Sequence, residues 1–273
     1  MTALSVQDVA FVQAMAEREA GLNLYDFRPG FVSERLAGVA STKGFSDAAA
    51  LVRALKNNQE GLIQAVLDGL LVNITSFFRN PASFVLLRDH VLPDLLLKNR
   101  ESREMRIWSA ACSTGQEAYS LAMLMPQCRA LLNGWKVSVF GSDISTAHIA
   151  QAQAGVYSHK EVARADEVLD AANYFHRKGE AWRVNDAVRS LTEFQPLNLF
   201  QLPASPQRFH VIFLRNVLIY FSRANAVRLL QGIRDCLMPG GYLFTGFYEH
   251  ADHLDPGGWL PVVRCGACAY QRL

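Results

Sequence analysis

Apolar residues recur at the spacing of an amphipathic helix throughout the first 72 residues of the chain. One such series begins at Val6, and two more begin at Leu51 and Leu62. Ser5 and Ser46 stand where a hydroxyl could cap a helix N-terminus. No β-rich run interrupts these segments. We therefore predict a small, all-helical N-terminal domain over residues 1–72.

From residue 73 to the end, apolar runs of strand length alternate with segments of helical periodicity. The runs predict strands at 105–111, 136–141, 209–214, 242–247 and 262–271. The periodic segments predict helices at 82–97, 116–131, 146–154 and 223–237. This alternation favours βαβ units with right-handed connections around a mainly parallel sheet. Residues 73–273 are therefore expected to form a second, α/β domain.

The stretch from residue 157 to residue 195 breaks the alternation. It is polar, with short β-like pieces at Trp182–Val184 and Val188–Phe194. We interpret it as a small β-subdomain inserted into the topology of the sheet.

Composition narrows the classes of protein. Half of the 273 residues are hydrophobic and 19% are charged, which excludes intrinsic disorder, and a formal net charge of +2 gives no argument for a nucleic-acid partner. No apolar run approaches the roughly 18 residues of a membrane helix, so we expect no membrane insertion. Five cysteines, an odd number, favour a reducing cytoplasm. Cys265 and Cys268 form a lone C-x-x-C, which we interpret as structural, and we predict no metal site.

Candidate chemistry follows the ends of the predicted strands, where an open α/β sheet binds its ligands. The small residues of 109–115 allow a ligand to approach the backbone closely, but they form no phosphate-binding glycine motif. Asp143 ends the second strand, where it could accept hydrogen bonds from a ribose or cap the next helix. Glu117 lies in the first turn of a helix, where it could bind a cationic ligand or stabilise the helix end.

A second group of polar residues follows the third strand of the series. Arg215 and Asn216 come directly after it, and Tyr220 one helical turn later, so all three would face the ligand. Arg79 could hold a substrate carboxylate through two parallel hydrogen bonds, or be an ordinary surface arginine. Phe77 and Phe78 are expected in the core.

Five segments, in order and at matching spacing, resemble the motifs of the chemotaxis receptor glutamate O-methyltransferases, the CheR family. They are Asn73–Arg79 (NITSFFR), Trp108–Ser120 (WSAACSTGQEAYS), Ser142–Ile144 (SDI), Pro196–Leu199 (PLNL) and Phe213–Phe221 (FLRNVLIYF). The resemblance covers nearly the whole chain. It implies a small helical domain joined to a Rossmann-like methyltransferase domain with an inserted β-subdomain. It also implies S-adenosylmethionine (SAM) as cofactor, S-adenosylhomocysteine as product, and glutamates on the cytoplasmic domain of a chemoreceptor as substrate.

The resemblance also implies roles for individual residues. The cofactor-binding residues would be Asn73, Thr75 and Arg79 at its methionine end, Glu117 and Asp143 at its amino-acid and ribose portions, Asn198 and Leu199 at its adenine, and Asn216. Arg79 and Tyr220 would lie nearest the incoming glutamate and act in catalysis.

The chain departs from the family pattern in three places. Gly115–Tyr119 reads G-Q-E-A-Y where G-E-E-P-Y is common, and Gly246–Glu249 reads G-F-Y-E where G-H-S-E is usual. Residues 1–72 carry six basic and eight acidic residues, a net charge of −2, where the family often has a basic helix. This leaves room for another carboxylate or small-molecule substrate, or for a SAM-binding scaffold without turnover. The chain is expected to be a monomer, and its short hairpin at Lys178–Glu180 favours the type that does not bind a receptor tail.

Overall fold

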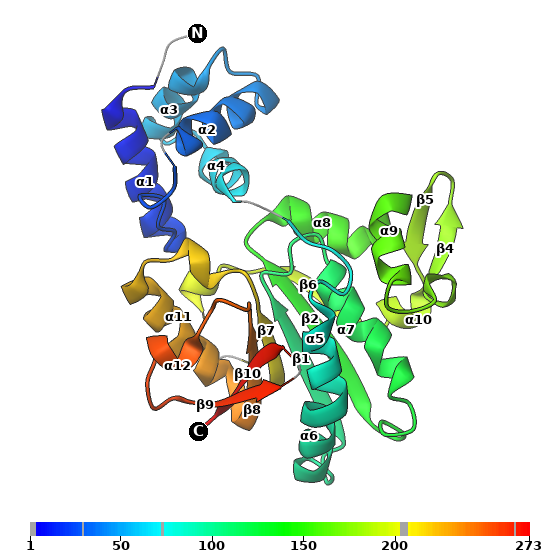
Figure 1. The fold of residues 1–273 in the computed structure, drawn as a ribbon. Helices are drawn as coiled ribbons and strands as arrows, with labels where there is room; N and C mark the ends of the chain where they lie inside the picture. The colour runs from blue at the N-terminus through cyan, green and yellow to red at the C-terminus, as the bar shows by residue number, and fades with distance from the viewer. Residues whose placement is uncertain (1–3, 29, 72–73, 203–206, 265) are drawn as a thin grey trace. The chain divides into compact units, whose positions relative to one another are not determined.

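The computed structural model describes residues 4–28, 30–71, 74–202, 207–264 and 266–273 (Figure 1). The chain divides into two compact units. One contains Met1–Ile74 and Tyr220–Asn225, and the other contains Thr75–Ile219 and Ala226–Leu273. In the described part of the chain, no helix is both long and apolar enough to cross a membrane.

The first unit is built from four helices that bury one face each. They are α1 (Val6–Ala20), α2 (Phe31–Thr42), α3 (Ala48–Lys56) and α4 (Leu62–Leu70). Leu36 of α2, Leu51 of α3 and Val66 of α4 are fully buried, and α2 contacts the other three helices. Ser5 caps α1 as predicted, since its hydroxyl accepts a hydrogen bond from Asp8 N at 3.1 Å. Ser46 does not cap α3.

Asp47 is the residue that caps α3, and its carboxylate accepts a hydrogen bond from Ala50 N at 2.8 Å. A carboxylate and a hydroxyl cap about equally well, so the S-D pair left the helix start uncertain by one residue. A segment from much later in the chain completes this unit. Asn23 N donates to Tyr220 O at 2.7 Å, and Asn225 Nδ2 donates to Gly21 O at 2.9 Å.

The second unit is organised around a seven-stranded sheet of order β6-β2-β1-β7-β8-β10-β9 (Figure 1). The strands are β1 (Glu104–Ala110), β2 (Lys136–Asp143), β6 (Thr192–Pro196), β7 (Phe209–Leu214), β8 (Leu237–Thr245), β9 (Trp259–Arg264) and β10 (Ala267–Arg272). In this order, each strand from β6 to β8 pairs in parallel with its neighbour. Strand β10 pairs antiparallel with both β8 and β9. Every residue of β7 is buried, as expected for a central strand covered on both faces.

Helices connect and cover the strands. They are α5 (Pro81–Leu86), the π-helical turn Leu87–Val91, α6 (Leu92–Lys98), α7 (Gln116–Gln127), α8 (Thr146–Ala154), α11 (Arg223–Cys236) and α12 (Ala251–Leu254). Helix α7 contacts β1, β2 and β6, which fixes its N-terminus at the carboxyl end of β1. The α/β class with a largely parallel sheet is therefore as predicted.

A separate three-stranded sheet lies in the stretch interpreted as an insertion. It consists of β3 (Val156–Tyr157), β5 (Ala181–Val184) and β4 (Phe175–Lys178), accompanied by α9 (His159–Asp166) and α10 (Asp186–Arg189). The segment Val188–Phe194 was wrongly interpreted as one further strand of this subdomain. It begins in α10 and continues into β6, which pairs with β2 at the edge of the main sheet.

The sequence prediction was wrong in three other places in this unit. The expected strand at 262–271 is the hairpin β9–β10, which turns next to Gly266 at φ +74°. The helix expected to reach residue 131 ends at Gln127, and β8 begins at Leu237 rather than at residue 242. Cys265 lies outside the described residues, so only Cys268 of the C-x-x-C is placed, half-buried in β10.

Candidate functional site

The small-residue loop after β1 is held against the end of β2. Ser113 N donates to Asp143 Oδ2 at 2.8 Å, and Cys112 N donates to Ser142 O at 2.8 Å. The loop turns through left-handed backbone, with φ +51° at Ser113 and +96° at Gly115. A Cβ on Gly115 would lie 2.7 Å from the Cβ of Ala152 in α8, so only glycine fits there.

Asp143 is only 5% exposed and uses both of its carboxylate oxygens. Oδ2 binds the Ser113 amide, and Oδ1 accepts from Ser145 N at 2.9 Å. The residue that caps α8 is Ser145, whose hydroxyl accepts from His148 N, so the alternative role of Asp143 as a helix cap is wrong. Asp143 instead joins the loops that follow β1 and β2.

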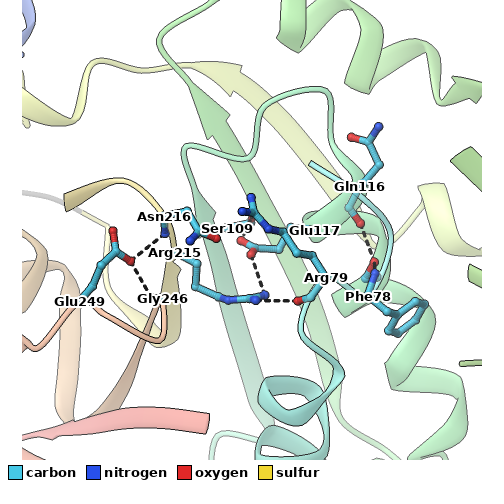
Figure 2. A network of polar contacts seen from close by, with 10 residues as sticks. Phe78, Arg79, Ser109, Gln116, Glu117, Arg215, Asn216, Gly246 and Glu249 are labelled. Atoms are coloured by element: carbon cyan, nitrogen blue, oxygen red, sulfur yellow. Dashed lines mark hydrogen bonds and ion pairs between the residues drawn. The ribbon is translucent and has the colours of Figure 1, made fainter. Parts of the chain in front are cut away.

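Glu117 lies in the first turn of α7 and forms a buried ion pair. Ser109 Oγ donates to Glu117 Oε1 at 2.8 Å, and Arg215 Nη1 lies 3.2 Å from Glu117 Oε2 (Figure 2). Burial raises the pKa of Glu117, and the nearby charge of Arg215 offsets part of that rise. Burial likewise lowers the pKa of Arg215. The site thus keeps a carboxylate whose charge is stabilised mainly by one arginine.

Arg215 also joins this ion pair to the segment before α5. Its Nη2 donates to the backbone oxygen of Arg79 at 2.6 Å, while its guanidinium lies about 6 Å from the ring centres of Phe84 and Phe213. The Arg79 side chain is exposed and extends toward Glu117 (Figure 2), where its charge lowers the pKa of that carboxyl. Arg79 and Glu117, predicted from separate motifs, therefore lie together.

Asn216 follows β7 in a left-handed conformation, with φ +60°, and its loop is bound by a second buried carboxylate. Glu249 Oε2 accepts from Asn216 N at 2.7 Å and Gly246 N at 2.6 Å, and Oε1 accepts from Val217 N and Leu218 N at 2.7 and 2.8 Å. We call these four amides and the carboxylate the Glu249 network; Figure 2 shows the bonds to Asn216 and Gly246. It joins the ends of β7 and β8. A Cβ on Gly246 would lie 2.4 Å from Glu249 Oε2, so the close approach requires glycine.

Sequence reasoning missed the Glu249 network. Glu249 was noted only as the last residue of a motif that departs from the family pattern. Its four partners are backbone amides, which leave no side-chain signal in a sequence. The only sequence feature consistent with a close backbone approach was Gly246, near the end of the strand predicted at 242–247.

Asn198 and Leu199 follow β6, beside the end of β2. Asn198 Oδ1 accepts from Phe200 N at 3.0 Å, and Leu199 is 9% exposed. Leu197 N donates to Asp143 O at 2.9 Å, which fixes this segment next to the predicted ribose-binding acid. The ends of β1, β2, β6, β7 and β8 thus all contribute to one edge of the sheet.

The remaining predicted residues differ in their placement. Thr75 is half-buried at the start of the second unit, and Asn73 lies outside the described residues. Tyr220 belongs to the first unit, where its ring stacks on Phe27 with 6.1 Å between ring centres. Phe77 and Phe78 are each 2% exposed, so their prediction as core residues is confirmed.

The donor set of the second unit suits a ligand with both a sugar and a positive charge. Two carboxylates, Glu117 and Asp143, flank the small-residue loop after β1. Ser113 Oγ is buried without a hydrogen-bond partner among the described residues, and a ligand hydroxyl or carboxylate could satisfy it. The fold and this edge define an α/β protein that gathers its polar candidate site at the carboxyl ends of a largely parallel sheet.

Comparison with known proteins makes the assignment specific. Residues 73–257 match the family described as CheR methyltransferase, SAM binding domain. The chain is 36% identical over 251 residues to chemotaxis protein methyltransferase 1 of Pseudomonas aeruginosa, covering 90% of this chain and 91% of that one. It is 34% identical over 262 residues to the chemotaxis protein methyltransferase of Escherichia coli, covering 92% and 88%.

The chain belongs to the CheR family, whose known role is the methylation of chemoreceptor glutamates. It is a SAM-dependent methyltransferase, and the resemblance, fold class, cofactor and chemotaxis function predicted from the motifs are confirmed. The loop after β1, together with Glu117 and Asp143, offers side chains and backbone suited to binding SAM. The buried Ser113 hydroxyl, which has no hydrogen-bond partner among the described residues, is consistent with such a ligand. The roles of individual site residues stay predictions.

Proposed function

We propose that this chain methylates glutamate side chains on the cytoplasmic domain of a chemoreceptor, and that the strand ends described above hold the cofactor. The observation that carries the proposal is the placement of Glu117, Asp143 and Arg79 around the loop after β1. SAM carries positive charge at its sulfonium and its ammonium, and the Glu117 carboxylate at this edge complements the ammonium.

The family motifs supply the proposed division of roles. Asp143 would accept hydrogen bonds from the ribose, Glu117 would face the amino-acid end, and Asn198 with Leu199 would border the adenine. Asn216 would complete the site, and Asn73 and Thr75 would approach the methionine end. Since Glu117 is already bound by Arg215 and Ser109, its carboxylate is fixed in position before any ligand arrives.

The chemistry needs no general base in this site. SAM supplies a methyl group on an electrophilic sulfonium, and a glutamate carboxylate is already ionised near neutral pH. The protein then has to orient SAM and the substrate carboxylate relative to each other. This orientation can supply roughly 7–11 kcal/mol of the barrier reduction. Arg79 would hold one oxygen of the substrate carboxylate, leaving the other oxygen to attack.

The first unit bears on which receptor is recognised. Its sequence carries a net charge of −2 over residues 1–72, so attraction to an acidic receptor helix through this unit would be weak. Each strand of the β4–β5 hairpin has four residues, and Gly179 lies in the turn between them with φ +63°. Such a compact hairpin favours recognition without a receptor tail. We propose a cytoplasmic location, because the proposed substrate is the cytoplasmic domain of a receptor, and we propose that the chain acts as a monomer.

Transfer of labelled methyl groups tests the proposal directly. The protein would be incubated with radiolabelled SAM and candidate receptor cytoplasmic domains, and base-labile methyl esters would be measured. Calorimetry should show micromolar binding of SAM and tighter binding of S-adenosylhomocysteine. Absence of binding by both compounds would overturn the enzyme assignment. Binding without any ester on a receptor would support a different carboxylate substrate.

Arg79→Ala tests the substrate side of the site. The variant should keep its fold, because Arg215 contacts the backbone oxygen of Arg79 rather than its side chain. Methyl transfer should be largely lost. Arg164→Ala, which removes an exposed arginine of α9 that pairs with Glu167, is the matched control and should retain activity. Unchanged turnover in Arg79→Ala would mean that the carboxylate-orienting residue has been misassigned.

A further inference from the structure

Helix α12 carries a cluster of metal-ligating side chains that the methyltransferase site does not use. His250, Asp252 and His253 each present one ligand atom, and these three atoms lie within 4.8 Å of one another. The His250 and His253 rings are 5.0 Å apart between centres and tilted by 32°. His253 Nε2 lies 3.9 Å from Asp252 Oδ2. Among the described residues, these three are the group of His, Cys, Asp or Glu side chains whose ligand atoms lie close enough together to hold a metal ion.

Two features of the cluster favour an ion rather than a purely structural arrangement. Asp252 Oδ1 is buried and makes no hydrogen bond of good geometry in the described structure, although the Tyr270 hydroxyl interacts with the same carboxylate, and Oδ2 faces His253. His250 and His253 are exposed, so their ring nitrogens can be reached from solvent without unfolding the helix. A cation bound between the three side chains would pair with the carboxylate and hold the two rings together.

The types of the three ligand side chains indicate which class of metal ion would bind. Two imidazoles and one carboxylate suit a first-row transition metal such as Zn²⁺ better than Mg²⁺ or Ca²⁺, which prefer oxygen ligands. Three protein ligands leave at least one coordination position for water in a tetrahedral zinc site. The rings must close in by a small side-chain rotation, because two zinc ligands at 2.0–2.2 Å from the metal lie only about 3.5 Å apart.

We propose that His250, Asp252 and His253 form a binding site for one divalent transition-metal ion, with Zn²⁺ as the test ion. The site lies immediately after Glu249 in the chain, so it borders the segment whose carboxylate holds the loops after β7 and β8. The prediction of no metal site rested on the lone C-x-x-C of Cys265 and Cys268 and did not consider this segment. The H-x-D-H pattern here has two histidines three residues apart with an aspartate between them.

Titration of the full-length protein with Zn²⁺, followed by calorimetry near neutral pH, tests the site. Wild type should bind one Zn²⁺ per chain at this location. The double variant His250→Asn, His253→Asn should weaken that binding by at least about tenfold, the loss that even changes outside the ligand shell produce. Asp252→Asn should weaken it as well, since the amide keeps the shape and removes the charge.

A matched control separates this site from other zinc ligands on the protein. His176→Asn removes an exposed histidine of β4, in the other sheet, and should leave affinity and stoichiometry unchanged. Circular dichroism without metal checks the fold of each variant. Equal Zn²⁺ affinity in wild type and the double variant would overturn the proposal. So would a wild-type protein that binds no Zn²⁺.

Discussion

Two glutamates at the same edge of the sheet keep a buried charge in different ways. Glu117 relies on one arginine and one hydroxyl, and burial raises its pKa. Glu249 is 4% exposed and accepts hydrogen bonds from four backbone amides, so its stabilisation is shared among several groups. An ion pair can be adjusted by changing either side chain, whereas a set of amides is fixed by the fold itself. We therefore expect Glu117 to tune ligand binding and Glu249 to maintain the structure of the loops.

The largest effect should follow from Glu249→Gln. An amide in place of the carboxylate turns one acceptor into a donor that faces the N–H groups of Asn216 and its neighbours. Loss of the charge-assisted bonds should lower the free energy of unfolding by about 3–5 kcal/mol. Urea denaturation measures this loss. Glu180→Gln, at an exposed position in the β4–β5 hairpin, should change stability by less than about 0.5 kcal/mol. A loss below about 1 kcal/mol in Glu249→Gln would mean that the amides find other acceptors.

A smaller loss is expected from Arg215→Met, which leaves the Glu117 carboxylate without its counter-ion. The cost should be about 2–3 kcal/mol, because Glu117 can take up a proton instead of remaining charged. Adding Glu117→Gln should recover part of it, with a coupling of at least about 1 kcal/mol in a double-mutant cycle. Strictly additive effects would contradict a direct ion pair. No single substitution should rescue Glu249→Gln in the same way, since its partners are backbone groups.

These two carboxylates also show what a sequence can reveal. Apolar runs and helical periodicity are local, so β7 and α8 were predicted with the bounds that the structure has. Strand-end position alone also pointed to Glu117 and Asp143, since parallel strands present their carboxyl ends at one edge. The resemblance to known motifs then supplied the cofactor, which no residue pattern could name.

The errors arose where distant residues decide the structure. The Glu249 network joins amides at 216–218 to a carboxylate about thirty residues later, and amides carry no sequence signal. The hairpin β9–β10 was read as one strand because both arms are rich in apolar residues and the turn is short. The segment that became α10 and β6 was assigned to the subdomain because only pairing with β2 places it in the main sheet.

The pH dependence of cofactor binding should distinguish the two glutamates further. Because burial raises the pKa of Glu117, this carboxyl takes up a proton at a higher pH than an ordinary glutamate as the solution is acidified. A neutral Glu117 would attract the cationic amino-acid end of SAM less, so affinity should fall by up to about tenfold as pH decreases through that pKa. Calorimetry between neutral pH and pH 5 measures this. Glu117→Gln should bind more weakly at neutral pH and lose this part of the pH dependence, and an unchanged profile would remove Glu117 from the ligand site.

The smallest effect should come from Ser109→Ala, which removes one hydrogen bond to Glu117 Oε1 and almost no volume. The unfolding free energy should fall by about 1 kcal/mol. Because that hydrogen bond lowers the pKa of Glu117, its loss should raise the pKa and move the pH dependence of SAM binding to higher pH. Ser142→Ala is the matched control, since its hydroxyl is equally buried but accepts from Trp108 Nε1. It should cost similar stability without moving the pH profile. A shift of equal size in both variants would show that the profile reports general loosening of the sheet edge, and would remove the distinction between a tunable Glu117 and a structural Glu249.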